Sequence, residues 1–322
     1  MPGSSIRLDA QCGKMTVYED RAAASGRQIE LNVAIIPAIS RSPAPDPMFF
    51  LAGGPGEAAT QSYIAIASAF GSIRSKRDIV LVDQRGTGGS HPLECGNSYQ
   101  GDDESDYLSA CLSQLDADPR LYTTSIAMQD LDQVRDALGY EEINIYGASY
   151  GTRAALVYLR MFPEHVRTII LDGAAPPNWT LGPSVAGDAQ RAIQMIFDRC
   201  MSEPACQKAF PNLSTEFDAL LMDLASQPVE VELDDPVSGE PTKVTLDYKS
   251  FSSTFHTMSY TPETAALMPL AIHNAFSRKD FRSIAAQTLS VSHLLYSSIS
   301  VGMRLSVICT EDMPYLETTF AT

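Results

Sequence analysis

The amino-acid sequence predicts a protein of the α/β class, in which a mostly parallel sheet with flanking helices carries a large helical insertion. Two observations lead to this class. Over the first half of the chain, short apolar runs alternate with segments of helical periodicity, as in βαβ units. From about residue 183 to 302, the pattern becomes mainly helical. The length of 322 residues allows one large domain of this kind or two average ones.

The strands of the expected sheet are short and mostly apolar. We expect them at residues 29–36, 48–51, 79–82, 143–146 and 166–171. The first alternates apolar with polar or small residues, which is typical of a strand near a sheet edge. The second and third are continuous apolar runs that end in turn residues, as buried parallel strands do.

Helices are expected between these strands at residues 126–138 and 150–161. In the first of them, apolar residues recur at helical spacing, and Gly139 is placed to end the helix. Pro163 closes the second, because proline cannot continue a helix.

The insertion contains further helical patterns and one hairpin. The helices lie at residues 189–201 and 213–225, and the hairpin strands at 229–233 and 243–246. Another helix is expected to begin after Thr261 as N-cap, with Pro262 in its first turn.

An insertion that follows a run of α/β units predicts a cap over the carboxyl ends of the strands. Open α/β sheets bind their ligands at that edge. We therefore expect a core at residues 1–178, a cap at 179–312, and the start of a return to the core at 313–322.

Charge and hydropathy exclude two classes of partner. The 23 Lys+Arg against 39 Asp+Glu give a net charge of −16, whereas nucleic-acid binding requires a basic face. No apolar run approaches the roughly 18 residues that a membrane-spanning helix needs. The sequence also shows no zinc-ligand spacing, so we expect neither a metal nor a cofactor. The oligomeric state is left open.

Four of the six cysteines form local pairs that suit disulfides, Cys95 with Cys111 and Cys200 with Cys206. Closing the first loop would stabilise the fold by roughly 3 kcal/mol in the chain-entropy model. The alternative is a set of buried thiols in a cytosolic protein. An oxidising compartment would require an export signal, and the first ten residues lack the apolar region of one.

The strongest chemical signal is Gly147-Ala-Ser149-Tyr-Gly151, which satisfies the pattern G-x-S-x-G. It lies between an expected strand and an expected helix, the context that a nucleophile elbow requires. The glycines allow the sharp turn that presents Ser149 Oγ, and the helix N-terminus favours negative charge developing there. Ser149 is therefore the predicted nucleophile.

A second signal, Ala52-Gly-Gly-Pro-Gly56, follows the apolar run at residues 48–51. A serine hydrolase needs two backbone N–H groups that bind the oxyanion of the tetrahedral intermediate. One is expected from Tyr150, the residue after the nucleophile, and the other from this loop. Pro55 has no N–H, which leaves Gly54 as the predicted second donor.

Together these segments resemble a known family. The residues that carry the resemblance are Leu51–Gly56, Asp83–Ser90, Gly147–Arg153, Leu171–Gly173 and Cys309–Asp312. In this order and spacing they look like the α/β-hydrolase-fold serine peptidases of the proline iminopeptidase and tripeptidyl aminopeptidase group. The resemblance runs from about residue 11 to 313 and implies the α/β-hydrolase fold.

The resemblance implies a serine aminopeptidase that releases N-terminal residues or short peptides from a substrate with a free amino end. In such enzymes, acidic residues of the cap region hold the substrate ammonium, and Glu311 and Asp312 fall in the matching stretch. Their alternative role is that of a solvated or helix-capping pair. Asp83 and Arg85 are expected to shape the loop after their strand. Because many members are exported, the family and the cysteines favour a secreted or periplasmic protein.

The rest of a catalytic triad is not found in this sequence. The family places its acid and its histidine after later core strands, in Asp-Pro-like and Gly-His-like turns, which are absent here. We expect both beyond residue 322 and an incomplete chain that is inactive alone; Asp172 is a weaker candidate for the acid. The alternative functions are a non-catalytic peptide-binding protein and an esterase acting on small acyl esters.

Overall fold

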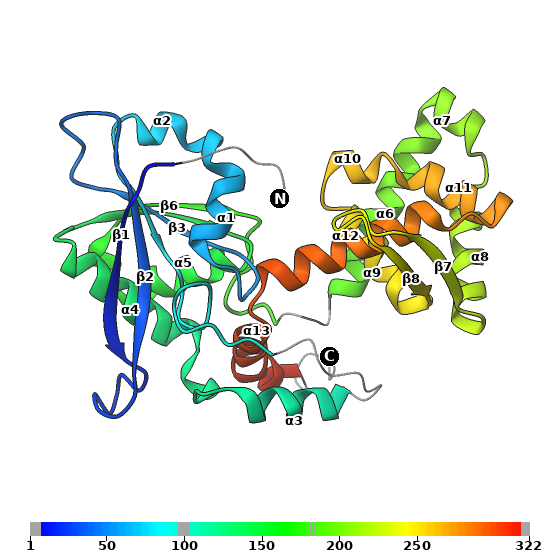
Figure 1. The fold of residues 1–322 in the computed structure, drawn as a ribbon. Coiled ribbons are helices and arrows are strands. Elements are labelled where there is room, and N and C mark those ends of the chain that lie inside the picture. The colour runs from blue at the N-terminus through cyan, green and yellow to red at the C-terminus, as the bar shows by residue number, and fades with distance from the viewer. Residues whose placement is uncertain (1–7, 96–103, 181, 183, 317–322) are drawn as a thin grey trace. The chain divides into compact units, whose positions relative to one another are not determined.

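The computed structural model describes residues 8–95, 104–180, 182 and 184–316. The chain divides into two compact units, of which the first comprises Met1–Leu181 with Ser298–Thr322 and the second comprises Gly182–Ser297. In Figure 1, the strands of the first unit are blue to green, and most of the second unit is yellow-green to orange. Each unit is described by itself below.

The first unit is built on a six-stranded mixed sheet in the order β1-β2-β4-β3-β5-β6. Its strands are β1 (Gln11–Tyr18), β2 (Gln28–Ile36), β3 (Met48–Leu51), β4 (Ile79–Val82), β5 (Ile143–Ala148) and β6 (Val166–Asp172). The strands from β4 through β3 and β5 to β6 are parallel, whereas β1 and β2 pair antiparallel with their neighbours. The expected mostly parallel sheet of the α/β class is thus present.

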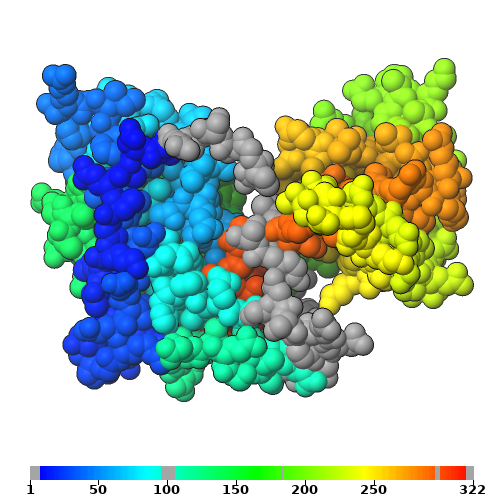
Figure 2. Space-filling model, viewed as in Figure 1, coloured from blue at the N-terminus to red at the C-terminus, as the bar shows by residue number. Residues whose placement is uncertain are grey.

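All five expected strands form, but β1 was missed. Its sequence, Gln-Cys-Gly-Lys-Met-Thr-Val-Tyr, buries only Val17, so it carries little of the apolar pattern that marks a strand. It forms because it pairs along its whole length with β2. In the space-filling view, these two strands (blue) lie at the surface of the first unit (Figure 2).

Helices cover both faces of the sheet because successive side chains of its central strands point to opposite faces. Phe49 of β3 belongs to the cluster formed with α4 (Thr124–Ala137) and α5 (Tyr150–Met161). Its neighbour Phe50 belongs to the cluster on the other face, with α1 (Ala59–Ile66). Both phenylalanines are at most 2 % exposed, so β3 is buried on its two faces.

Helix α4 begins two residues before the expected start, because Thr123 is its N-cap and accepts a hydrogen bond from the Ile126 N–H. At its other end, Gly139 has φ 76°, as expected of a glycine that ends a helix. The described part of the first unit also contains the α-helices α2 (Gly71–Arg74), α3 (Glu104–Gln114) and α13 (Val301–Val307), and a turn of π-helix, Ile308–Asp312, follows α13.

Helix α13 moves the boundary between the units away from the expected one. Residues 298–312 were expected in the cap, but they fall in the first unit. The reason is apolar packing: Met303 and Val307 are fully buried in a cluster with Leu93, Tyr122 and Tyr150. The expected start of a return at residue 313 is a short turn of helix, Met313–Tyr315, and residues 317–322 lie outside the described ones.

The second unit is mainly helical, as expected. It contains α6 (Val185–Ser202), α7 (Pro204–Ala209), α8 (Leu213–Ser226), α9 (Tyr248–Met258), α10 (Pro262–Ala265), α11 (Met268–Arg278) and most of α12 (Arg282–Ser298), with the hairpin β7 (Val229–Asp234) and β8 (Pro241–Leu246). Its core includes Phe217, Phe251 and Phe255. The helix expected after Thr261 does begin there, with the Thr261 hydroxyl accepting from the Thr264 N–H, but it lasts only one turn.

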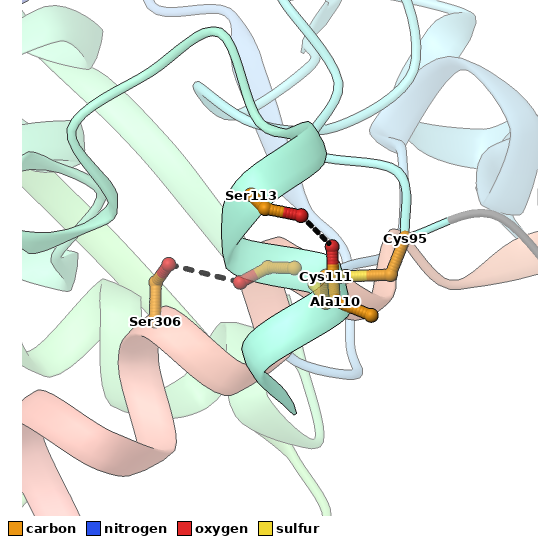
Figure 3. The surroundings of a disulfide bond; sticks show 6 residues. Cys95, Ala110, Cys111, Ser113 and Ser306 are labelled. Atoms are coloured by element: carbon orange, nitrogen blue, oxygen red, sulfur yellow. Dashed lines mark hydrogen bonds between the residues drawn. A yellow bond between two sulfur atoms is a disulfide. The ribbon is translucent and has the colours of Figure 1, made fainter. Parts of the chain in front are cut away.

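Two disulfides close short loops, one in each unit. Cys95 is bonded to Cys111 of α3, and Cys200 of α6 is bonded to Cys206 of α7. Figure 3 shows the first of them, which ties α3 to the segment that contains Leu93 and Cys95, with Ser306 of α13 nearby. Cys12 and Cys309 are free and exposed. Among the helices of the described residues, none is both long and apolar enough to cross a bilayer.

Strand β6 forms an edge of the sheet, and this edge carries a prediction. Within the described residues only β5 pairs with it, and Ile170 and Leu171 on its two faces are 43 % and 38 % exposed. Unpaired backbone groups beside apolar side chains favour strand pairing between molecules. We expect the chain to self-associate and Ile170→Lys to shift it toward monomer in sedimentation velocity. A wild-type chain that sediments as a monomer at every concentration would refute this.

Candidate active site

Ser149 lies at the junction between β5 and α5, in a backbone conformation that few residues adopt. Its φ of 52° and ψ of −119° place it at the N-cap of α5, with a positive φ that is uncommon outside glycine. Such strain persists only where the surroundings enforce it. Here the Ser149 N–H donates a 2.8 Å hydrogen bond to the carbonyl of Asp172 at the end of β6. The turn therefore holds Ser149 at the carboxyl edge of the sheet.

The two glycines of the G-x-S-x-G segment are required because backbone approaches them closely. A β-carbon on Gly147 would lie 2.3 Å from the carbonyl oxygen of Gly151. A β-carbon on Gly151 would lie 2.2 Å from the carbonyl oxygen of Leu51, at the end of β3. Glycine at both positions thus lets the first turn of α5 pack directly on the sheet beside Ser149.

The glycine-rich loop after β3 lies directly beside Ser149. The position that a β-carbon on Gly53 would occupy is 3.4 Å from Ser149 Cβ, and Gly54 has φ 106°. The far end of the loop is held by Ser300, whose N–H donates to the Gly56 carbonyl at 2.9 Å. The proposed donor Gly54 thus lies in a loop that is fixed at its far end by this hydrogen bond. The Tyr150 N–H is the first of α5, so no carbonyl within the helix accepts from it.

The side chain of Tyr150 anchors the turn from the other side. It is 2 % exposed, and its hydroxyl lies 2.7 Å from Thr124 Oγ1 and accepts from Gln84 Nε2 at 3.1 Å. Burial, helped by the negative charge of Glu311, raises the pKa of the Tyr150 hydroxyl above its usual value. The neutral ring is fixed in place, so the backbone N–H that follows Ser149 is fixed with it.

The structure gives Glu311 and Asp312 partners within the chain. Glu311 accepts hydrogen bonds from the N–H and hydroxyl of Thr124, at 2.5 and 2.8 Å, at the beginning of α4. Asp312 is 2 % exposed and pairs with the equally buried Arg153 at 3.1 Å. The contacts of Glu311 fit the helix-capping alternative, whereas the buried ion pair of Asp312 fits neither alternative. The role of the two residues in binding a substrate ammonium stays a prediction.

Asp83 and Arg85 shape the loop after β4, as expected. Arg85 is fully buried and donates to both carboxylate oxygens of Asp130 at 2.6 and 3.0 Å, and to the carbonyls of Glu19 and Leu121. Asp83, also fully buried, accepts from the N–H and hydroxyl of Thr60 in α1 and from the Gly89 N–H of the loop. These contacts hold the loop after β4 against α1 and α4.

The two histidines of the first unit make contacts away from Ser149. His91 is hydrogen-bonded to the carbonyl of Asp116, and His165 lies 2.7 Å from Asp132 at the amino end of β6, the opposite edge of the sheet. Burial would raise the pKa of Asp132, but hydrogen bonds from Arg135, Tyr158 and His165 outweigh it and lower that pKa below 3.8.

The three histidines of the second unit also have partners there. His256 contacts Tyr260, His273 contacts Glu216, and His293 contacts Asp235.

Asp172, the weaker candidate for the triad acid, accepts a short hydrogen bond from the Tyr146 hydroxyl. Burial and this bond raise the pKa of Tyr146 to about 12. Among the described residues of the first unit, no histidine contacts either Asp172 or Ser149, so the base and acid of a triad stay a prediction.

One residue near Ser149 was missed by the sequence analysis. Glu57 directly follows the Gly-Gly-Pro-Gly run, a position from which its side chain can turn back over the loop. Its Oε2 accepts from the Gly53 N–H and from the Ser62 hydroxyl, both at 3.2 Å. The only sequence signal was an acidic residue immediately after a loop proposed to bind an oxyanion.

The known proteins that this chain resembles are alpha/beta hydrolases and peptidases. A model of the alpha/beta hydrolase fold matches residues 46–260. The chain is 30 % identical over 192 residues to a tripeptidyl aminopeptidase of Streptomyces coelicolor, covering 52 % of this chain and 36 % of the relative. It is 28 % identical over 201 residues to the serine protease Hip1 of Mycobacterium tuberculosis, covering 55 % and 38 %.

A third relative is a proline iminopeptidase of Lactobacillus delbrueckii subsp. bulgaricus, 30 % identical over 126 residues, or 39 % of this chain and 35 % of the relative. The matched regions thus span little more than a third of each relative's length. The resemblance drawn from the motifs is confirmed. With the strand order of its sheet, the turn at Ser149 and a family match over most of its length, this chain belongs to the alpha/beta hydrolase fold family.

Proposed function

We propose that this protein is a serine hydrolase that acts through an acyl-enzyme on Ser149 and releases N-terminal residues or short peptides from a free amino end. The observation that carries the proposal is the conformation of Ser149, held at φ 52° at the N-cap of α5 between strand and helix. The peptidase names of the relatives support the choice of substrate.

In the proposed reaction, Ser149 Oγ attacks the carbonyl carbon of the scissile bond and passes its proton to a general base. The N–H groups of Gly54 and Tyr150 stabilise the resulting oxyanion. The C–N bond then breaks, the amine leaves with the proton, and water hydrolyses the ester on Ser149. The general base is not assigned to a residue.

A peptide-binding protein without turnover is a second candidate, because neither described histidine of the first unit contacts Ser149. An esterase is a third, since the elbow and the oxyanion loop serve either leaving group.

A substrate panel separates these candidates. In a protein that also contains the acid and histidine expected beyond residue 322, we expect Ser149-dependent release of arylamine from aminoacyl- and tripeptidyl-arylamides, measured as kcat/KM by absorbance. Turnover of short-chain aryl esters without turnover of arylamides would identify an esterase. Binding of peptides with neither turnover nor covalent labelling of Ser149 would identify a binding protein and refute the proposed function.

A further inference from the structure

We propose that the free edge of β7, in the second unit, binds the C-terminal end of a partner polypeptide as an added strand, with the terminal carboxylate held by Arg278. The inference goes beyond the proposed function, because it concerns a different surface and does not depend on Ser149. Three features of the second unit carry it: the direction of the backbone groups of β7, a groove along its edge, and the charges that line this groove.

One edge of β7 has no strand beside it. In the described part of the second unit, β7 pairs only with β8, in a two-stranded antiparallel hairpin (Figure 1). Such a hairpin alternates between residue pairs that exchange both backbone hydrogen bonds and pairs that exchange none. The Asp235 N–H donates to the Glu240 carbonyl at 2.9 Å, so residue 235 points its backbone groups across the hairpin. The alternation then places residues 233, 231 and 229 in hydrogen-bonded pairs with β8.

The backbone groups of Glu230 and Glu232 therefore point away from β8. Pro241 agrees with this alternation, because it lies opposite Asp234 and has no N–H to donate to it. Among the described residues, no backbone hydrogen bond reaches Glu230 or Glu232 from outside the hairpin. An unpaired edge of this kind is a template for another extended chain.

A groove runs along the free edge of β7. Its volume is about 490 Å³, and it is lined by residues 229–232 on one side and by residues 278–282, the turn between α11 and α12, on the other. Because successive side chains of a strand point to opposite faces, a groove that touches four residues in a row lies at an edge. Phe281, which is 7 % exposed, anchors the turn in the core of the unit. Four residues of strand are about 13 Å long, so the groove suits an occupant of about this length.

The groove contains a guanidinium that lacks an ion pair. Arg278 is exposed and forms none in the described part of the chain, whereas the two neighbouring cations have carboxylate partners, Asp223 and Asp280. On the opposite wall, Glu232 is paired with Lys243 of β8 at 2.8 Å. Arg278 is thus free to bind an anion, and a carboxylate suits it because the guanidinium fork matches two carboxylate oxygens.

The two faces of an added strand decide which carboxylate fits. On the solvent face, its side chains would lie beside those of Glu230 and Glu232, which repel another carboxylate. On the other face, they would lie beside the buried Val231, where a carboxylate would lose water. The carboxylate at the end of a chain belongs to neither face, and the strand can end wherever along the edge Arg278 lies. A C-terminal end therefore fits better than an internal acidic residue.

A second copy of this chain is a poor occupant of the same edge. If β7 paired with β7 of another molecule, Glu230, Glu232 and Asp234 of both strands would gather on one face of the joined sheet. Like charges at cross-strand positions are destabilising. Strand β8 shows what β7 accepts, because its Lys243 lies opposite Glu232 and forms an ion pair with it. The residues of the partner next to these glutamates should therefore be basic or neutral.

The first test measures how tightly a short peptide binds to the full chain, by fluorescence anisotropy. The probe has the sequence of residues 242–246, Thr-Lys-Val-Thr-Leu, with a fluorophore on its amino end and a free C-terminal carboxylate. Its twin ends in an amide. We expect the carboxylate form to bind about 3- to 5-fold more tightly than the twin, the upper range for an exposed ion pair. Arg278→Gln should reduce this ratio to about 1, and the matched control Arg199→Gln, at an exposed position of α6, should leave it unchanged.

A second pair of variants tests the strand addition itself. Glu230→Pro removes an N–H that points to the free edge and leaves the bonds to β8 in place. Glu230→Gln removes the same charge and keeps the N–H. We expect the proline variant to bind the probe about 5- to 10-fold more weakly than the glutamine variant, the effect of losing about one backbone hydrogen bond.

Hydrogen exchange followed by mass spectrometry locates the bound probe. It should slow exchange in residues 229–234 and leave exchange in residues 241–246 unchanged. Equal affinity for the two probes, a ratio that Arg278→Gln does not alter, equal binding by the two Glu230 variants, or slowed exchange in β8 alone would overturn the proposal. Protection of β7 that rises with chain concentration in the absence of probe would assign the edge to a second copy and overturn it as well. None of these outcomes bears on the proposed chemistry of Ser149.

Discussion

Replacing Ser149 with alanine is expected to remove nearly all hydrolysis, leaving only the residual rate that the oxyanion hole and substrate binding supply, and to abolish covalent labelling by a fluorophosphonate probe. The probe reacts by forming a bond from the serine oxygen to phosphorus as fluoride leaves, so without Oγ no adduct can form. Loss of the nucleophile from a complete serine triad costs on the order of 10⁶-fold in kcat. Mass spectrometry of the labelled wild-type protein should place the adduct on the peptide that contains Ser149.

The Ser149→Ala variant should remain folded, because alanine keeps the β-carbon and the N–H that donates to Asp172. Its melting temperature, compared with wild type, checks this point. Ser202→Ala, at an exposed position of α6, is the matched control and should label like wild type. Labelling that survives Ser149→Ala would show that the nucleophile lies elsewhere.

Replacing Asp130 with alanine is expected to lower the free energy of unfolding by about 3–5 kcal/mol, the usual cost of leaving a buried charge without its partner. Asp130 accepts two hydrogen bonds from Arg85, whose side chain is 0 % exposed, and a third from Arg21 at 2.7 Å. Without the carboxylate, the Arg85 guanidinium stays buried with only carbonyl partners. Denaturant titration followed by circular dichroism measures the difference.

The matched control is Glu30→Ala, which breaks the ion pair with Lys14. That pair has a similar distance of 2.8 Å, but its side chains are 57 % and 53 % exposed. Exposed pairs contribute about 0–1 kcal/mol, so this variant should remain within that range of wild type. If Asp130→Ala is no more destabilising than Glu30→Ala, then the buried pair is not what holds the loop after β4.

The sequence predicted features that depend on short stretches of chain. The pattern Gly147-Ala-Ser149-Tyr-Gly151 implied a sharp turn between strand and helix, and the structure has that turn, with Ser149 at φ 52°. The five apolar strands and the helices beside them also formed where periodicity placed them. In each case the residues that determine the structure lie within a few positions of one another.

The features that the sequence did not reveal depend on contacts between distant residues. Strand β1 has almost no apolar pattern and exists because β2 pairs with it. The C-terminal helix α13 belongs to the first unit because its apolar side chains pack on Leu93 and Tyr122. Glu57 lies near Ser149 because β3, which precedes the Glu57 loop, pairs with β5, which precedes Ser149.

The acidic residues near the site show most clearly how locally encoded features differ from those that depend on contacts between distant residues. By itself the sequence determined the α/β class, the turn that holds Ser149 and the loop beside it, because local backbone preferences and apolar periodicity encode them. Only the tertiary structure decided which carboxylates have partners. Glu311 meets Thr124 across 187 residues and Asp312 meets Arg153 across 159, whereas Glu57 has no cation among the described residues. The pairing of a charge depends on which groups folding brings within about 4 Å of it, and no local pattern records that distance.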